Sequence, residues 1–167
     1  MAETKTKIRR SKIAVFLNVG TAEEENWALI GDGVTEQTIS YNPNVSEETY
    51  VHQDSATSDV ESYKLNIPTP MTAISGDPVF EYVDDIRIKR KVLADARTQC
   101  LIVYLYKTET SGKYPAEKNE CSVSVEDFGG AGGEAAKINF TLNLIGDPVA
   151  GQFDPSSKTF TEDSEIA

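Results

Sequence analysis

Hydrophobic and polar residues alternate along most of this chain in short runs, which is the pattern of β-strands that bury one face. The compact apolar run Ile13–Val19 predicts a buried first strand. Gln99–Tyr106 is rich in Ile, Val, Leu and Tyr and predicts a central strand. Apolar residues alternate with polar ones in Glu120–Glu126 and again in 136–145. The pattern therefore predicts a mainly β fold with antiparallel strands.

Segments rich in glycine and proline separate these runs. Thr108–Lys113 and Gly146–Pro148 are predicted to turn the chain, with Tyr114 and Pro115 leading from the first turn toward the next strand. The segment 149–161 is predicted to form a short closing hairpin. A phosphate loop is a poor interpretation of the glycine run Gly129–Gly133, because such a loop needs a Lys-Ser/Thr pair and a helix after its last glycine. A strand pattern follows here instead, so we interpret the run as a flexible hairpin loop.

One α-helix is predicted from Asp77 to about Lys91, on a flank of the sheet. Asp77 can cap the helix, and Pro78 suits the first helical position, where its missing N–H has no cost. Acidic residues come early in this segment and basic residues late, which is the order that the helix dipole favours. The predicted apolar face consists of Val79, Phe80, Tyr82, Val83 and Ile86.

The segment 42–59 is the longest polar stretch between strand-like runs. After a short strand at Trp27–Ile30, the alternating run Val34–Tyr41 precedes it and Val60–Ile67 follows it. This arrangement predicts a β-hairpin with an unusually long connection. Loops of about 15 residues with no secondary structure of their own are uncommon in compact domains and are usually functional or disordered. Pro68, just after the second flank, favours a sheet edge there.

Tyr50 and Val51 give this polar connection apolar surface to bury. We therefore expect an arm that becomes ordered against a neighbouring molecule rather than a free linker. The residues of this candidate intersubunit loop are Asn42, Pro43, Asn44, Val45, Glu47, Glu48, Tyr50, Val51, His52 and Asp54.

The length of 167 residues suits one domain with its own core. We expect a single β domain over 12–161, a flexible N-terminal arm over 1–11 and a flexible acidic tail over 162–167. The contact residues proposed for the arm are Lys7, Arg9 and Arg10. Because no run of about 18 apolar residues and no apolar signal-peptide core occur, we predict no membrane span, and synthesis in a cytoplasm.

The net charge of −11 is unevenly distributed along the chain. Between Ala14 and Tyr63 the fixed charges are all acidic, which argues against an ordinary nucleic-acid-binding surface. Such polarity can serve solubility alone, or it can form complementary patches that steer identical subunits head to tail. For the second interpretation the candidate intersubunit basic patch is Arg87, Lys89, Arg90 and Lys91.

Candidate chemistry is sparse. His52 is the only histidine and has no second histidine or cysteine nearby in sequence, so neither a zinc site nor a Ser-His-Asp triad has motif support. Cys100 and Cys121 lie in apolar runs and are interpreted as buried free thiols, with a bridge as the alternative if their strands are neighbours. The acidic pairs lie on polar loops, where carboxylates are usually solvated. We therefore predict no enzymatic activity, no metal and no cofactor.

Two segments resemble the major tail tube proteins of long-tailed, siphovirus-type phages of Gram-positive hosts. They are Trp27–Gly33 (W-A-L-I-G-D-G) and Val34–Val45 (V-T-E-Q-T-I-S-Y-N-P-N-V), followed by an acidic, Ser/Thr-rich turn that leads into Tyr63. The resemblance implies an antiparallel β-sandwich or partly closed barrel. It also implies hexameric rings that stack through a long hairpin loop into a hollow tube, which conducts DNA without binding it specifically.

The same resemblance implies a location in the virion tail, with assembly in the host cytoplasm. The partners it implies are further copies of the chain together with tape-measure, tail terminator and distal tail proteins. Two alternatives stay open on the sequence. One is the inner tube of a contractile injection system, and the other is a monomeric β-sandwich module that binds carbohydrate or a host surface, with Tyr50 and Tyr114 as candidate contacts.

Overall fold

The structure is a computed structural model that describes residues 4–163. Its helical elements are η1 (Arg10–Lys12), α1 (Pro78–Lys89) and η2 (Leu93–Ala96). Its strands are β1 (Ile13–Asn18), β2 (Trp27–Leu29), β3 (Pro43–Glu48), β4 (Thr57–Tyr63), β5 (Asn66–Thr72), β6 (Arg97–Tyr104), β7 (Tyr114–Gly129), β8 (Lys137–Asp154) and β9 (Thr159–Glu162).

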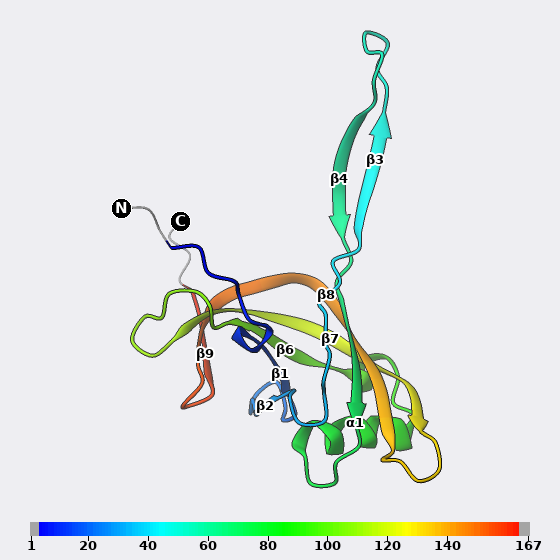
Figure 1. Cartoon of the computed structure of the whole chain (residues 1–167), viewed down its shortest axis with the longest axis vertical. Helices are drawn as coiled ribbons and strands as arrows, with labels where there is room; N and C mark the ends of the chain where they lie inside the picture. The colour runs from blue at the N-terminus through cyan, green and yellow to red at the C-terminus, as the bar shows by residue number, and fades with distance from the viewer. Residues whose placement is uncertain (1–3, 164–167) are drawn as a thin grey trace.

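A seven-stranded antiparallel sheet forms the body of the molecule, in the order β2-β1-β6-β7-β8-β5 with β9 also paired to β8. β5 pairs with the first half of β8 and β9 with its last residues, so both lie along the same edge of that strand. The long strands β7 and β8 curl, and α1 lies under the sheet (Figure 1). The mainly β, partly closed antiparallel fold with one flanking helix is thereby confirmed.

The body has a core on each face of the sheet. β6 is buried on both faces, because Cys100 and Ile102 point to one cluster while Leu101 and Val103 point to the other. The larger cluster lies between the sheet and α1, and the smaller one is closed by the β9 hairpin, where the rings of Phe16 and Phe153 lie 4.7 Å apart. A strand buried on both faces needs a nearly continuous apolar sequence, which 100–103 supplies.

The helix has the ends that its sequence predicts. The Asp77 carboxylate accepts a hydrogen bond from the Phe80 N–H at 3.0 Å, and Pro78 occupies the first turn. Arg90 terminates the helix in a left-handed conformation, with φ of 47°. Val79, Phe80, Val83 and Ile86 are the buried residues of α1. No helix in residues 4–163 is long and apolar enough to cross a membrane.

The hairpin prediction was right in kind and wrong in its strands. β3 and β4 lie largely within the polar segment that was predicted to be a connection, and only 49–56 is a loop. Two strands that form a ribbon in solvent bury neither face, so their sequence carries no apolar alternation to reveal them. The ribbon projects away from the body, at the end opposite α1 (Figure 1).

The predicted strand at Val34–Tyr41 was wrong. This segment pairs with the sheet only through a bridge between Ser40 and Asn66. Val34 and Ile39 pack against the main core, and the buried amide of Gln37 donates a hydrogen bond to the Thr69 hydroxyl at 2.9 Å. Its alternation therefore reflects side-chain packing of an extended segment rather than strand pairing.

One predicted turn was also wrong. Gly146–Pro148 is part of the continuous strand β8, where three residues face one residue of β7, because Lys118 pairs with Val149 and Glu120 pairs with Ile145. Such a bulge bends a strand and uses the same residue types as a turn. The turn predicted at Thr108–Lys113 is confirmed, with a bridge between Thr110 and Lys113 around its tip. Pro115 lies in β7 beyond the last residue that pairs with β6, so its missing N–H is not needed there.

Candidate assembly surfaces

The β3–β4 ribbon is an acidic surface with apolar spots. None of its strand residues is buried. Val45 and Val60 face each other across the two strands and are 48% and 53% exposed. Its ionised side chains are all acidic, namely Glu47, Glu48, Asp54, Asp59 and Glu61. An isolated two-stranded hairpin is marginally stable in water, and no packing against the body of its own subunit adds to the stability of this ribbon.

The tip of the ribbon has a defined local structure. The Gln53 N–H donates to the Tyr50 carbonyl at 2.9 Å, and the Tyr50 N–H donates back to the Gln53 side-chain oxygen at 3.2 Å. The Tyr50 hydroxyl donates to the Glu48 carboxylate at 2.7 Å, and this hydrogen bond raises the pKa of the tyrosine. The His52 ring stacks on Tyr50, while Val51 is fully exposed at the apex.

The base of the ribbon is fixed to the sheet edge. Asn42 adopts a left-handed conformation, with φ of 43°, and its amide donates to the Lys64 carbonyl at 3.0 Å. The rings of Tyr41 and Tyr63 meet edge to face at 6.3 Å between centroids. Only Lys64 and Leu65 separate β4 from β5, so the ribbon leaves the body as an extension of its edge strand.

The basic patch predicted at the end of α1 is largely neutralised within the helix segment. Arg87 pairs with Asp84 at 2.6 Å, and both Lys89 and Lys91 pair with Asp85, at 2.9 and 2.8 Å. Hydrogen bonds from Lys91 and Lys89 lower the pKa of the Asp85 carboxyl. The Arg87 guanidinium also covers the Phe128 ring at 4.1 Å. Within residues 4–163, Arg90 and Arg97 form no ion pair.

An open groove of about 790 Å³ separates the C-terminal end of α1 and η2 from β7. Its walls combine apolar and basic side chains without any acidic one: Ile86, Arg87, Arg90, Lys91, Val92, Leu93, Ala96, Arg97, the β7 residues Ser122–Val125, and Ile145. Val92 and Leu93 are 66% and 81% exposed, and Leu93 is held at a φ of 54°. Large apolar side chains next to unpaired arginines are a common composition of protein-binding surfaces.

The N-terminal segment has one fixed point. Arg10 lies in η1, and its guanidinium donates to the Gln37 carbonyl at 3.1 Å and to the Gln37 side-chain oxygen at 3.2 Å. It also contacts the Ile13 carbonyl. Lys7 and Arg9 are exposed residues without secondary structure. The residues 1–3 of the predicted arm and 164–167 of the predicted tail lie outside the described part of the chain.

The described residues bring no catalytic constellation together. No group of three or more histidine, cysteine or acidic side chains in residues 4–163 is arranged to hold a metal ion. Cys100 and Cys121 are both buried and free, as the sequence predicted. A hydrogen bond with Cys100 and burial both raise the pKa of the Cys121 thiol, which therefore stays protonated and unreactive at neutral pH.

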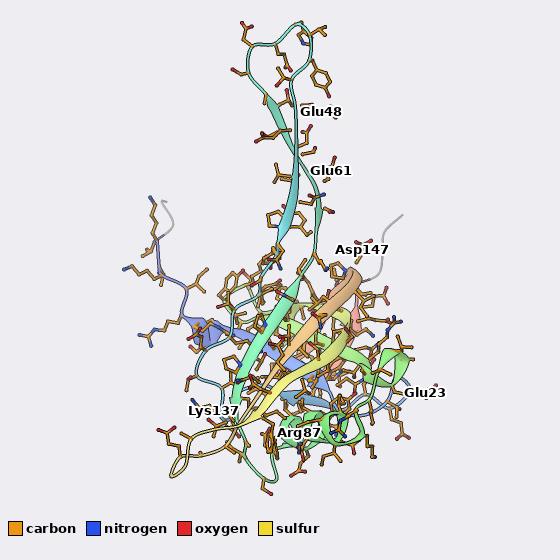
Figure 2. All side chains as sticks on the ribbon, turned by 90° about the vertical axis from the view of Figure 1, so that its right-hand side faces the viewer. Glu23, Glu48, Glu61, Arg87, Lys137 and Asp147 are labelled. Carbon is orange, nitrogen blue, oxygen red and sulfur yellow. The ribbon has the colours of Figure 1, made fainter. Side chains whose placement is uncertain are left out.

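The predicted site residues form separate surfaces rather than one site. The loop residues from Asn42 to Asp54 lie together on the ribbon, and the basic residues Arg87 to Lys91 lie near the opposite end of the molecule (Figure 2). Sequence reasoning missed Val92, Leu93 and Arg97 in the groove. A usable signal was the pair of large apolar residues directly after the helix, outside its apolar face.

The comparisons with known proteins find a shared fold among solved structures and no match by sequence. No family model matches the chain, and neither does any curated protein. Among solved structures, the same fold occurs in a chain from the tail of an empty gene transfer agent (GTA) particle. That tail structure was computed with helical refinement and C6 symmetry. The match has a TM-score of 0.62 and 11% sequence identity, and it covers 93% of this chain and 99% of that chain.

Proposed function

We propose that this chain is the structural subunit of a phage tail tube. The observation that carries the proposal is the β3–β4 ribbon, a pair of strands that buries no residue in its own subunit. A fold shared over nearly the full length with a chain of a C6-symmetric tail supports the same function. The ribbon does not stabilise a monomeric subunit, because it adds exposed strand edges without adding core.

In this function six subunits close into a ring and the rings stack into a hollow tube. The edge strand β2, at one end of the sheet, supplies a hydrogen-bonding edge for a neighbouring subunit. At the other end, the outer edge of β5 is covered by the segment 33–40 of the same chain, through the hydrogen bonds of Asn66 to Ser40 and of Thr72 to Gly33. The ribbon reaches the next ring, and a head-to-tail contact that does not close on itself generates a filament. The acidic excess of the chain repels DNA phosphates, so the genome slides through the tube rather than adhering to it.

The remaining assignments rest on the sequence resemblance. They are the origin of the chain in a long-tailed phage of a Gram-positive host, the assembly of the tube in the host cytoplasm, and contacts with tape-measure, tail terminator and distal tail proteins. The N-terminal residues Lys7 and Arg9 are proposed to become ordered between subunits. A contractile inner tube would use the same ring and the same ribbon.

A binding module is the second candidate, because Tyr50 is exposed at the ribbon tip. The other aromatic candidate, Tyr114, is half-buried and donates its hydroxyl hydrogen bond to Glu109 at 3.2 Å, which leaves little of it for a ligand. The two tyrosines also lie on different elements, β7 and the ribbon loop. Tyr50 and Tyr114 therefore do not form one contiguous aromatic platform of the kind that sugar binding uses.

Electron microscopy and sedimentation of the purified chain over a range of concentrations test the proposal. Rings or hollow tubes that grow with concentration are the expected result. A folded particle that stays monomeric at high concentration, with or without a preformed tail end to start assembly, would contradict the tube subunit and favour the binding module.

A further inference from the structure

The ribbon and the groove have opposite charge and lie at opposite ends of the molecule. Figure 2 places Glu48 and Glu61 on the ribbon and Arg87, a residue of α1, at the far end. The ribbon has only acidic ionised groups, and the groove walls have only basic ones. Within one subunit these surfaces lie too far apart to meet, so the acidic groups of the ribbon cannot pair with the basic groups of the groove in the same subunit.

Each surface has charged groups without an ionic partner in the described residues. On the ribbon, the carboxylates of Glu47, Glu48 and Glu61 accept hydrogen bonds only from neutral groups, the Ser58 hydroxyl, the Tyr50 hydroxyl and the Asn44 amide. In the groove, Arg87 and Lys91 are paired to Asp84 and Asp85, but Arg90 and Arg97 have no acidic partner within residues 4–163. The two free arginines are therefore the ones that an incoming carboxylate would meet.

The apolar residues of the two surfaces also correspond. The ribbon tip presents Val51 at its apex with Tyr50 beside it, and the groove presents Val92 and Leu93 at its rim. A loop that leaves two such side chains in water, one of them in a left-handed conformation, gains from a partner that covers them. A central apolar contact with charged residues around it is the usual anatomy of a specific interface.

We propose that the tip of the β3–β4 ribbon of one subunit docks into the groove between α1, η2 and β7 of a second copy of this chain. This inference rests on the proposed function and names the acceptor for the ribbon. Val51 and Tyr50 cover Val92 and Leu93, while carboxylates beside the tip face Arg90 and Arg97. The six residues of β3 extend about 20 Å at about 3.3 Å per residue, which carries the tip beyond the body of its own subunit.

A charge exchange tests the pairing. Reversing the groove with Arg90→Glu and Arg97→Glu, or the ribbon with Glu47→Lys and Asp54→Lys, should each lower the pelleted tube fraction at least tenfold at low salt. The four changes combined should restore most of it, because the charges again oppose. Lys107→Glu with Lys158→Glu is the matched control, since it makes the same charge change on exposed loops away from both surfaces. Circular dichroism verifies that each variant is folded.

An intersubunit disulfide provides an independent test. Val51→Cys with Leu93→Cys in one chain should give a ladder of covalent oligomers when assembled tubes are oxidised, and the buried Cys100 and Cys121 should not contribute. The comparison variant Val51→Cys with Ile8→Cys places the second thiol on the exposed, basic N-terminal segment, which is the competing acceptor. Only the Leu93 variant should cross-link.

The outcomes separate this inference from the proposed function. Tubes without a Leu93 ladder, a ladder with Ile8 alone, or a combined charge exchange that fails to restore assembly would overturn the groove as acceptor and leave the tail tube subunit intact. A wild-type protein that forms no rings or tubes under any condition would overturn both.

Discussion

The body and the ribbon of this subunit are both built from antiparallel strands, but they differ in how much of each strand is buried. In the body, β6 buries Cys100, Leu101, Ile102 and Val103 completely, and each face of the sheet has its own core. In the ribbon, β3 and β4 bury nothing. The body is therefore stable by its own packing, whereas the ribbon contributes stability only when another molecule covers it. Strand pairing alone does not tell which part of a protein is the folded domain.

The largest expected effect comes from removing the ribbon. Replacing 46–59 by Asn-Gly joins Val45 and Val60, which already face each other, through a turn suited to a two-residue hairpin. Tubes should disappear, while the free energy of unfolding changes by less than about 1 kcal/mol because no core residue is lost. Electron microscopy and urea denaturation measure the two effects. Tubes of normal length from this variant would remove the ribbon from stacking.

A pair of truncations sharpens the same contrast. Phe140→Ala, in the main core, should destabilise the subunit by about 3–5 kcal/mol, because it leaves a cavity at a fully buried site. Val60→Ala, on the ribbon, should change the free energy of unfolding by no more than about 0.5 kcal/mol. Urea denaturation of the unassembled subunit measures both. Equal losses would mean that the ribbon belongs to the cooperative unit of the body.

The helix end provides a smaller effect within the body. Asp77→Ala removes the acceptor of the Phe80 N–H and should cost about 1 kcal/mol. Asp77→Asn should retain most of this stability, because an asparagine side chain caps nearly as well. Thermal unfolding of the two variants beside the wild type measures the difference, and an equal loss in both would point to the charge rather than to the hydrogen bond.

The smallest effect is expected at alkaline pH. Burial and the nearby Glu117 raise the pKa of Tyr104 well above its ordinary value. As pH rises, this tyrosine ionises in the unfolded chain at a lower pH than in the folded one. The protonated Tyr104 therefore makes its full contribution to the free energy of unfolding below pH ~10, and this contribution is lost as pH rises above that value. Tyr104→Phe should flatten the fall of stability above pH ~10. Urea denaturation at several alkaline pH values measures the slope, and an unchanged slope would assign it to other tyrosines.

The elements that sequence predicted well are those that bury one face regularly. β1, β6 and α1 were found close to their predicted bounds because each combines a clear apolar period with a clear end, such as the Asp77-Pro78 start of the helix. The ribbon strands were not found, because a strand exposed on both faces has no apolar period. The opposite error occurred at Val34–Tyr41, where packing against the core produced a strand-like pattern without strand pairing.

The candidate surfaces were predictable to a similar extent. The acidic segment and the basic end of the helix could be read from charge alone, and both lie on the surface where they were expected. The neutralisation of Arg87, Lys89 and Lys91 depends on their spacing from Asp84 and Asp85, and Lys91 reaches Asp85 only because the helix ends at Arg90 in a left-handed turn. The groove needs the tertiary approach of η2 to β7, which no local pattern encodes.

The pairing of β1 with β6 gives the chain an order of folding during synthesis. Ile13 pairs with Tyr104, and Asn66 in β5 pairs with Asn143, so the sheet cannot close until most of the chain has left the ribosome. Non-local pairing of this kind is slow, whereas a hairpin whose strands are joined by a short loop forms in microseconds. The residues of the ribbon therefore leave the ribosome and can pair transiently before the groove, which needs both α1 and β7, is complete. In the proposed docking, a contact made by the ribbon of a nascent chain can therefore only be with the groove of a finished copy.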